Sequence, residues 1–220
     1  MTTRGKSRIA ILNPNSTERM TMEMVRSARS AAGAGADVVG MTNQRGPASI
    51  QGPEDAERCL DGLYGMFDAA CAQDVHAVII GCFDDTGLGT LRNRGRLPVI
   101  GLGEAGYLAG SLASARFAVV TSLDVSIPVI ADNIRAMRLD DRCAGVHASG
   151  VPVLDLNTSP DSLNRVQASV DATAAAYPGC SIVLGCGGMT TLAPHIKAPE
   201  GSIVIDPVIA SAHMCLAALS

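Results

Sequence analysis

The chain has 220 residues, of which 47% are hydrophobic and 17% charged, and this balance excludes an intrinsically disordered protein. The net charge of -4 and the 3% aromatic content exclude the basic, aromatic-rich surface typical of nucleic-acid binding. No stretch approaches the roughly 18 apolar residues of a membrane span, and the apolar run 9–12 after the basic start is too short for a signal peptide. We therefore expect a cytoplasmic protein that has neither nucleic acid nor a membrane as a partner.

Short runs rich in β-branched residues alternate with longer helical patterns, which favours an α/β fold with mainly parallel sheets covered by helices. Three helix starts carry candidate caps at Ser16, at Asp124 and in Ser159-Pro160-Asp161, where Pro suits an early helical position. In chain order, the expected strands are 9–13, 37–41, 77–81, 99–101, 117–121, 144–148, 182–185 and 203–205. The expected helices cover 17–32, 54–73, 103–113, 125–137, 161–176 and 207–218.

Two Gly-Cys pairs stand at the ends of matching apolar runs. Gly81-Cys82 follows A-V-I-I and Gly185-Cys186 follows S-I-V-L, and each cysteine is followed at equal offsets by Thr and Leu. We interpret this as a duplication that gives two pseudo-symmetric α/β domains, although any two parallel βα units could share such features. The C-terminal helix could pack back on the first domain. The expected domains are 1–110, which carries Cys82, and 111–220, which carries Cys186.

The carboxyl ends of several expected strands carry polar side chains. In open α/β sheets, ligands bind beyond these ends, and Asn13, Cys82, Thr121 and Cys186 all fall there. If a twofold axis relates the halves, they converge on a cleft between the domains. Asn13 either contacts a ligand there or forms an Asx-type turn, and Thr121 with Ser122 either contacts a ligand or caps a helix.

Two thiols that face each other suit a racemase with two bases, in which one group removes a proton and the other returns one to the opposite face. The ordinary thiol pKa of about 8.5 can be lowered at a helix N-terminus. Gly187 and Gly188 would let the backbone approach a small ligand, and nearby N–H groups could hold developing negative charge. We therefore predict Cys82 and Cys186 as a coupled acid/base pair that needs no metal and no cofactor.

The chain contains seven cysteines but no C-x-x-C pair, so neither a zinc site nor a disulfide framework is expected. We expect the cysteines outside the two Gly-Cys pairs to be inert, buried, small hydrophobic side chains. These are Cys59, Cys71, Cys143, Cys180 and Cys215.

Five segments in order are N-P-N-S at 13–16, G-P-A-S-I at 46–50, G-C-F-D-D-T-G-L at 81–88, P-V-I-G at 98–101 and L-G-C-G-G-M at 184–189. Together they resemble the aspartate/glutamate racemase superfamily, and within it the hydantoin and allantoin racemases, over nearly the whole chain. The resemblance implies a homo-oligomeric isomerase that racemises a small molecule, a 5-substituted hydantoin or allantoin, without a cofactor. It assigns catalysis to Cys82 and Cys186 and substrate binding to Asn13, Phe83, Thr121, Ser122, Gly187 and Gly188.

Three positions depart from the family pattern. The family commonly has a small residue at Asp84 and Pro at Thr86, and often Ala at Gly187. Because these positions line or support the pocket, the identity of the substrate's side chain stays open, as does any role of His195. Both cysteines are present, which weighs against the related arylmalonate decarboxylases, since these work with one.

Other functions remain as alternatives. The first is a racemase of an acidic amino acid or a related small acid. Segment 101–106 fits G-x-G-x-x-G, and with Asp124 it would suit a NAD-dependent oxidoreductase, although tight helix packing also explains the glycines. Cys186, Asp206 and His213 follow the order of a cysteine hydrolase, but this leaves the first Gly-Cys pair without a role. The last is a non-enzymatic ligand-binding protein of the same fold.

Overall fold

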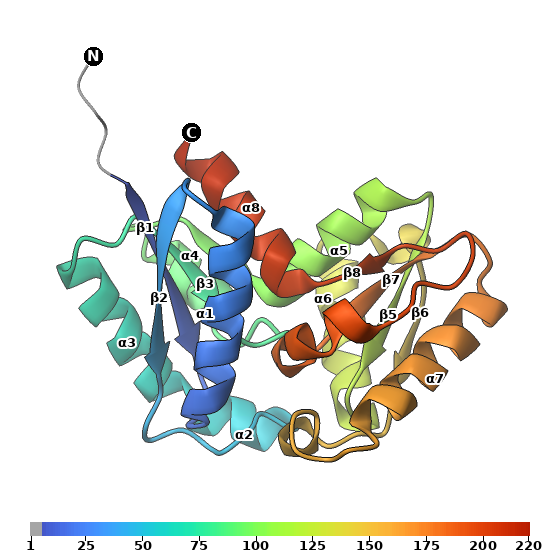
Figure 1. Cartoon of the computed structure of the whole chain (residues 1–220). Coiled ribbons are helices and arrows are strands. Elements are labelled where there is room, and N and C mark those ends of the chain that lie inside the picture. Colours follow the sequence, from blue (N-terminus) through green and yellow to red (C-terminus); the bar gives the residue numbers. More distant parts are fainter. Residues whose placement is uncertain (1–5) are drawn as a thin grey trace.

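The computed structural model describes residues 6–220 as two four-stranded parallel sheets flanked by helices (Figure 1). The sheets have the orders β2-β1-β3-β4 and β6-β5-β7-β8, so the second half repeats the topology of the first. All the strands expected from the sequence are confirmed, whereas residues 1–5 of the basic start lie outside the described residues. The strands are β1 (Ser7–Asn13), β2 (Ala36–Thr42), β3 (Ala77–Ile80), β4 (Val99–Gly101), β5 (Phe117–Thr121), β6 (Cys143–Ala148), β7 (Ser181–Gly185) and β8 (Val204–Ile205).

The helices differ from the expected pattern at a few points. The segment 54–73 forms two helices that meet at Cys59, and α4 was not expected because six residues are too few to show a helical period. Ser16 is not a cap, since Thr17 holds that position, whereas Asp206 accepts a hydrogen bond from the Val208 N–H at the start of α8. The helices are α1 (Glu18–Ala32), α2 (Pro53–Arg58), α3 (Leu60–Ala72), α4 (Leu88–Asn93), α5 (Leu102–Ala113), α6 (Ile127–Ala136), α7 (Ser162–Ala176) and α8 (Pro207–Leu219).

Alternating side chains of β1 pack into two different hydrophobic clusters, because successive residues of a strand point to opposite faces of the sheet. Ile9 and Ile11 belong to a cluster that continues into the second half of the chain. Ala10 and Leu12 pack on the other face in a cluster that includes Phe67 of α3. Burial on both faces explains why the strand reads as a continuous apolar run.

Helices α5 and α8 join the two halves. α5 follows β4 of the first sheet but packs against β7 of the second, and α8 follows β8 but packs against α1 and β3 (Figure 1). A Cβ at Gly106 or Gly110 would lie 2.7 or 2.8 Å from a methyl group of Val183, so these glycines permit the close approach of α5 to β7. We retain the domains 1–110 and 111–220 as a proposal, with the boundary inside α5.

Across residues 6–220, the structure contains no helix that is long and apolar enough to cross a bilayer.

Candidate active site

Cys82 and Cys186 line one cavity between the two halves of the molecule. Each follows the carboxyl end of an inner strand, Cys82 after β3 and Cys186 after β7, which is where open α/β sheets bind ligands. The cavity encloses about 30 Å3, room for about one or two water molecules, so it must widen to admit a ring. The other residues that line it are Asn15, Met20, Ile50, Gly81, Phe83, Asp84, Thr121, Ser122, Ser126, Val153, Gly185 and Gly187.

The Cys186 thiol lies at the start of a 3-10 helix, η4 (Gly187–Thr191). Burial raises its pKa to about 11, and the charge of Asp84 acts in the same direction. The backbone N–H groups of Gly188 and Met189 oppose this rise in pKa. The sequence indicated that a helix N-terminus can lower a thiol pKa, and the backbone N–H groups act in that direction here, but burial outweighs them.

The Cys82 thiol has a more anionic environment. Burial raises its pKa well above the usual range, and the next largest cause of the rise is the charge of Asp84. Its Sγ atom lies 3.8 Å from the Thr86 hydroxyl oxygen, and this contact opposes the rise in pKa. Of the two cavity thiols, Cys186 therefore has the environment that better tolerates a thiolate.

Asp84 connects the turn after β3 to the second half of the chain. Its backbone carbonyl accepts a hydrogen bond from Asn133 Nδ2 at 3.0 Å, and its Oδ2 atom accepts one from Ser126 Oγ at 3.4 Å. Burial raises the pKa of this carboxyl to about 6. The sequence singled out Asp84 as a departure from the family pattern, and the structure places it at the wall of the cavity.

Among the predicted substrate-binding residues, Asn13 does not line the cavity. Its side-chain amide donates to Asn15 Oδ1 and Thr21 Oγ1, both at 2.9 Å, and its Oδ1 atom accepts from the Asn15 N–H. The Asx-type turn that the sequence left open is thus the arrangement found, and Asn15 lines the cavity instead. Sequence spacing gave no signal for Asn15, because two asparagines in one turn look equivalent.

The other predicted contacts lie at or beside the cavity. Phe83, Thr121, Ser122 and Gly187 line it, whereas Gly188 contributes through its N–H to Cys186. The Thr121 hydroxyl donates to the Gly185 carbonyl at 2.9 Å, which leaves it as an acceptor toward a ligand. The sequence missed Met20, Ile50, Ser126 and Val153, which come from turns and helices whose position depends on the packing of the two halves.

The glycine motif at 101–106 has a structural explanation. The carboxylate of Asp85 accepts hydrogen bonds from the N–H groups of Gly103 at 2.9 Å and Glu104 at 2.7 Å. In a dinucleotide-binding fold, such N–H groups at the helix start would face the pyrophosphate. Here they are occupied by a side chain, and a Cβ at Gly101 would collide with it. These contacts leave the oxidoreductase alternative without support.

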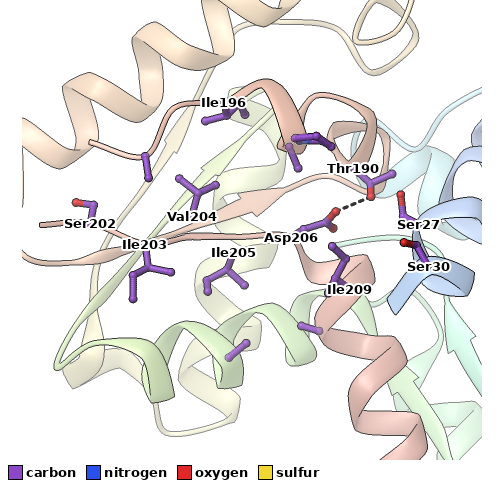
Figure 2. A pocket seen from close by; sticks show the side chains of 15 residues that line it. Ser27, Ser30, Thr190, Ile196, Ser202, Ile203, Val204, Ile205, Asp206 and Ile209 are labelled. Atoms are coloured by element: carbon purple, nitrogen blue, oxygen red, sulfur yellow. Dashed lines mark hydrogen bonds between the residues drawn. The ribbon is translucent and has the colours of Figure 1, made fainter. Parts of the chain in front are cut away.

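A larger groove of about 760 Å3 lies beside β8 (Figure 2), and neither Cys82 nor Cys186 lines it. At its end Asp206 accepts a hydrogen bond from the Thr190 hydroxyl at 2.6 Å, drawn as a dashed line in Figure 2, and another from the Val208 N–H. No cysteine lines this groove, and His213 is exposed on α8. The cysteine hydrolase alternative therefore finds no support in the positions of its residues.

The positions of His195 and of the potential metal ligands give neither a function at this site. His195 is exposed and does not line the cavity. Within residues 6–220, no group of three or more His, Cys, Asp and Glu side chains is placed to hold a metal ion.

Comparisons with known proteins agree with this fold. The family model described as Asp/Glu/Hydantoin racemase matches residues 9–215. A hydantoin racemase of Rhizobium meliloti is 35% identical over 212 residues, which cover 96% of this chain and 88% of that protein. The structure of allantoin racemase from Klebsiella pneumoniae superposes with a TM-score of 0.88 at 30% identity, covering 97% of this chain and 89% of the other.

Allantoin racemase from Pseudomonas fluorescens gives a TM-score of 0.89 at 28% identity, with 96% and 90% of the two chains covered. A glutamate racemase from Bacillus anthracis, at 17% identity and a TM-score of 0.73, shares the fold. From its sequence and its fold, the chain is an isomerase that belongs to the Asp/Glu/hydantoin racemase family.

Proposed function

We propose that the protein racemises a 5-substituted hydantoin or allantoin without a cofactor, and that Cys82 and Cys186 are its two bases. The observation that carries this proposal is that both thiols line the same cavity and come from opposite halves of a duplicated fold. The names of its relatives, hydantoin racemase and allantoin racemase, point to the same substrates.

The reaction needs one thiolate and one thiol. The thiolate on one side removes the proton from C5 of the hydantoin ring, and the electron pair of the C–H bond moves into the adjacent carbonyl as an enolate. The thiol on the other side then gives its proton to the opposite face of C5. The product has the inverted configuration, and the two cysteines have exchanged protonation states, so the enzyme is ready for the reverse reaction.

We propose that the thiolate rests mainly on Cys186. At Cys186 the N–H of Gly188 has a larger effect on the thiol pKa than the charge of Asp84, whereas at Cys82 the charge of Asp84 has a larger effect than the backbone N–H of Asp84. Because burial holds the pKa of Cys186 at about 11, the ionised fraction, and with it the rate, should increase with pH across the neutral and mildly alkaline range.

The charge of the cavity argues against an acidic amino acid as the substrate. Among the described residues that line it, Asp84 is the one charged side chain, and Lys, Arg and His are absent. A substrate carboxylate would therefore enter next to a like charge without a cation to pair with it, which is costly in a buried site. The neutral ring of a hydantoin avoids this cost.

The test is to incubate single enantiomers of 5-substituted hydantoins, allantoin, aspartate and glutamate with the enzyme in D2O. Optical rotation reports racemisation, and proton NMR reports loss of the signal of the exchanging C–H. We expect both changes together for a hydantoin or allantoin, above the spontaneous rate, and neither for the acidic amino acids. Absence of exchange across the whole panel would overturn the proposal.

The family resemblance also supports a homo-oligomer that acts on its small-molecule substrate in the cytoplasm. Sedimentation velocity should give a mass that is a multiple of the chain mass, and a monomer at all concentrations would contradict this part of the proposal.

A further inference from the structure

The backbone of Asp84 is fixed by a hydrogen bond, but its carboxyl group has few hydrogen-bond partners. The backbone carbonyl of Asp84 is fixed by Asn133, but the carboxyl accepts one hydrogen bond, a long one of 3.4 Å from Ser126. A carboxylate has lone pairs for about four hydrogen bonds. No cation of the described residues offsets the burial of this group. The group is therefore a strong acceptor at the cavity wall that still lacks strong donors.

We infer that Asp84 selects the substituent on C5 of the substrate by accepting hydrogen bonds from its N–H groups. The preferred substrates then carry a ureido or similar N–H-rich substituent, whereas alkyl substituents bind less well and carboxylate substituents are rejected. This inference rests on the proposed racemisation and names the substrate class of the same site.

The position of Asp84 relative to both thiols fits this role. Asp84 lines the same small cavity as Cys82 and Cys186, so it lies close to the place where C5 must sit between the two sulfurs. Proton removal puts negative charge on the ring carbonyl, and a like charge beside that oxygen would raise the barrier. A productive orientation therefore turns the carbonyl away from Asp84, which leaves the ring N1–H and the C5 substituent on its side.

Two energetic effects favour a substituent that donates hydrogen bonds to Asp84. Hydrogen bonds to a charged acceptor are stronger than those between neutral groups, and a buried carboxylate without donors bears the full cost of its lost hydration. A substituent with N–H groups supplies these donors, an alkyl group supplies none, and a carboxylate adds a second negative charge. The order of preference thus follows from Asp84 and from the absence of a cation among the described lining residues.

A matched set of substrates can test the order. The ureido group of allantoin, an isobutyl group and a carboxymethyl group have the same number and branching of non-hydrogen atoms, but they differ as donor, apolar and anionic substituents. We expect kcat/KM for racemisation to fall in that order, with the ureido substrate favoured over the isobutyl one by about 10- to 100-fold after the spontaneous rate is subtracted.

Asp84→Asn keeps the size of the side chain and removes its charge. We expect this variant to reduce the ratio of kcat/KM for the ureido substrate to that for the carboxymethyl substrate by about tenfold or more. Asp84→Ser, which is smaller, should act in the same direction and serves if the first variant folds poorly. Asp124→Asn is the matched control, because Asp124 is exposed and does not line the cavity, and it should leave the ratio unchanged.

The possible failures can be told apart. If the parent enzyme racemises none of the three substrates, the proposed function itself is wrong. If the parent racemises the isobutyl and ureido substrates with equal kcat/KM, the selection by Asp84 is overturned. It is also overturned if both Asp84 variants slow all three substrates equally, since that result would indicate contact with the ring or a structural role.

Discussion

The two halves of the chain have the same sheet order and place a cysteine after the same strand, but they differ in the turns that follow. After β3 the turn carries the carboxyl groups of Asp84 and Asp85, whereas after β7 it consists of Gly187 and Gly188. The first turn places the Asp84 carboxyl and one backbone N–H near its thiol, whereas the second presents two backbone N–H groups to its thiol. Duplication thus accounts for where the thiols are, and the turns surround them with different polar groups.

The paired threonines differ in the same way. Thr86 lies 3.8 Å from Cys82 Sγ, but Thr190 donates to Asp206 at 2.6 Å, away from its cysteine. Equal spacing in the sequence therefore predicts equal places in the fold without predicting equal roles. In the proposed mechanism the two thiols are in opposite protonation states, and their unequal surroundings fit the proposal that the resting thiolate is mainly on Cys186.

The largest expected effect comes from removing either thiol. Cys82→Ser and Cys186→Ser should each lose about 100- to 10,000-fold in the rate of racemisation, because a hydroxyl is a far weaker acid and base. Polarimetry with one enantiomer of the favoured substrate measures this loss. Cys71→Ser, in α3 outside the cavity, is the control and should keep the parental rate. A large loss of racemisation rate in only one of the two variants would contradict the proposal that both thiols act as bases.

Substitution by alanine should destabilise the fold to different degrees at the two glycines that precede the cysteines. A Cβ at Gly185 would lie 2.9 Å from the backbone and side chain of Thr121, which is fixed in β5, whereas at Gly81 the nearest atom is the flexible end of Met24 at 3.0 Å. Gly185→Ala should reduce the free energy of unfolding by about 1–3 kcal/mol, and Gly81→Ala by less. Urea unfolding measures both, and an equal or larger loss for Gly81→Ala would contradict the comparison.

Removing the charge of Asp84 should make the thiols more alike and more acidic. This carboxylate raises the pKa of both Cys82 and Cys186, so Asp84→Asn lowers both values. The increase of kcat/KM with pH should then begin at a lower pH, by up to about one unit. A pH profile with the isobutyl substrate tests this, with Asp124→Asn as control. An unchanged profile, or a shift to higher pH, would show that Asp84 does not act on the thiols.

The same substitution should stabilise the fold slightly. The pKa of Asp84 is about 6 in the folded protein, above its ordinary value, so ionisation as the pH rises through that range disfavours folding. Asp84→Asn should raise the free energy of unfolding by about 1–2 kcal/mol at mildly alkaline pH and have little effect where the carboxyl is protonated. Denaturant unfolding at a mildly alkaline pH and at a pH low enough to protonate the carboxyl checks this. A lower free energy of unfolding for the variant at alkaline pH would contradict it.

Much of the fold was predictable from the sequence because its strands are buried on both faces and read as continuous apolar runs, as in β1 and β7. The short helix α4 was not predictable, since it is too brief to show a period. At the site, spacing predicted Cys82 and Cys186, but Asn15 and Ser126 reach the cavity only through the packing of the two halves. The direction of the thiol pKa values depends on burial, which no local pattern reveals.

The central claim is that the two thiols act on opposite faces of one carbon. The most direct test is C5 proton exchange in D2O, measured by NMR on each pure enantiomer with Cys82→Ala and with Cys186→Ala. Each variant keeps one base, so each should exchange one enantiomer only, and the two variants should favour opposite enantiomers. Exchange of the same enantiomer by both variants, or racemisation by either at the parental rate, would contradict the account.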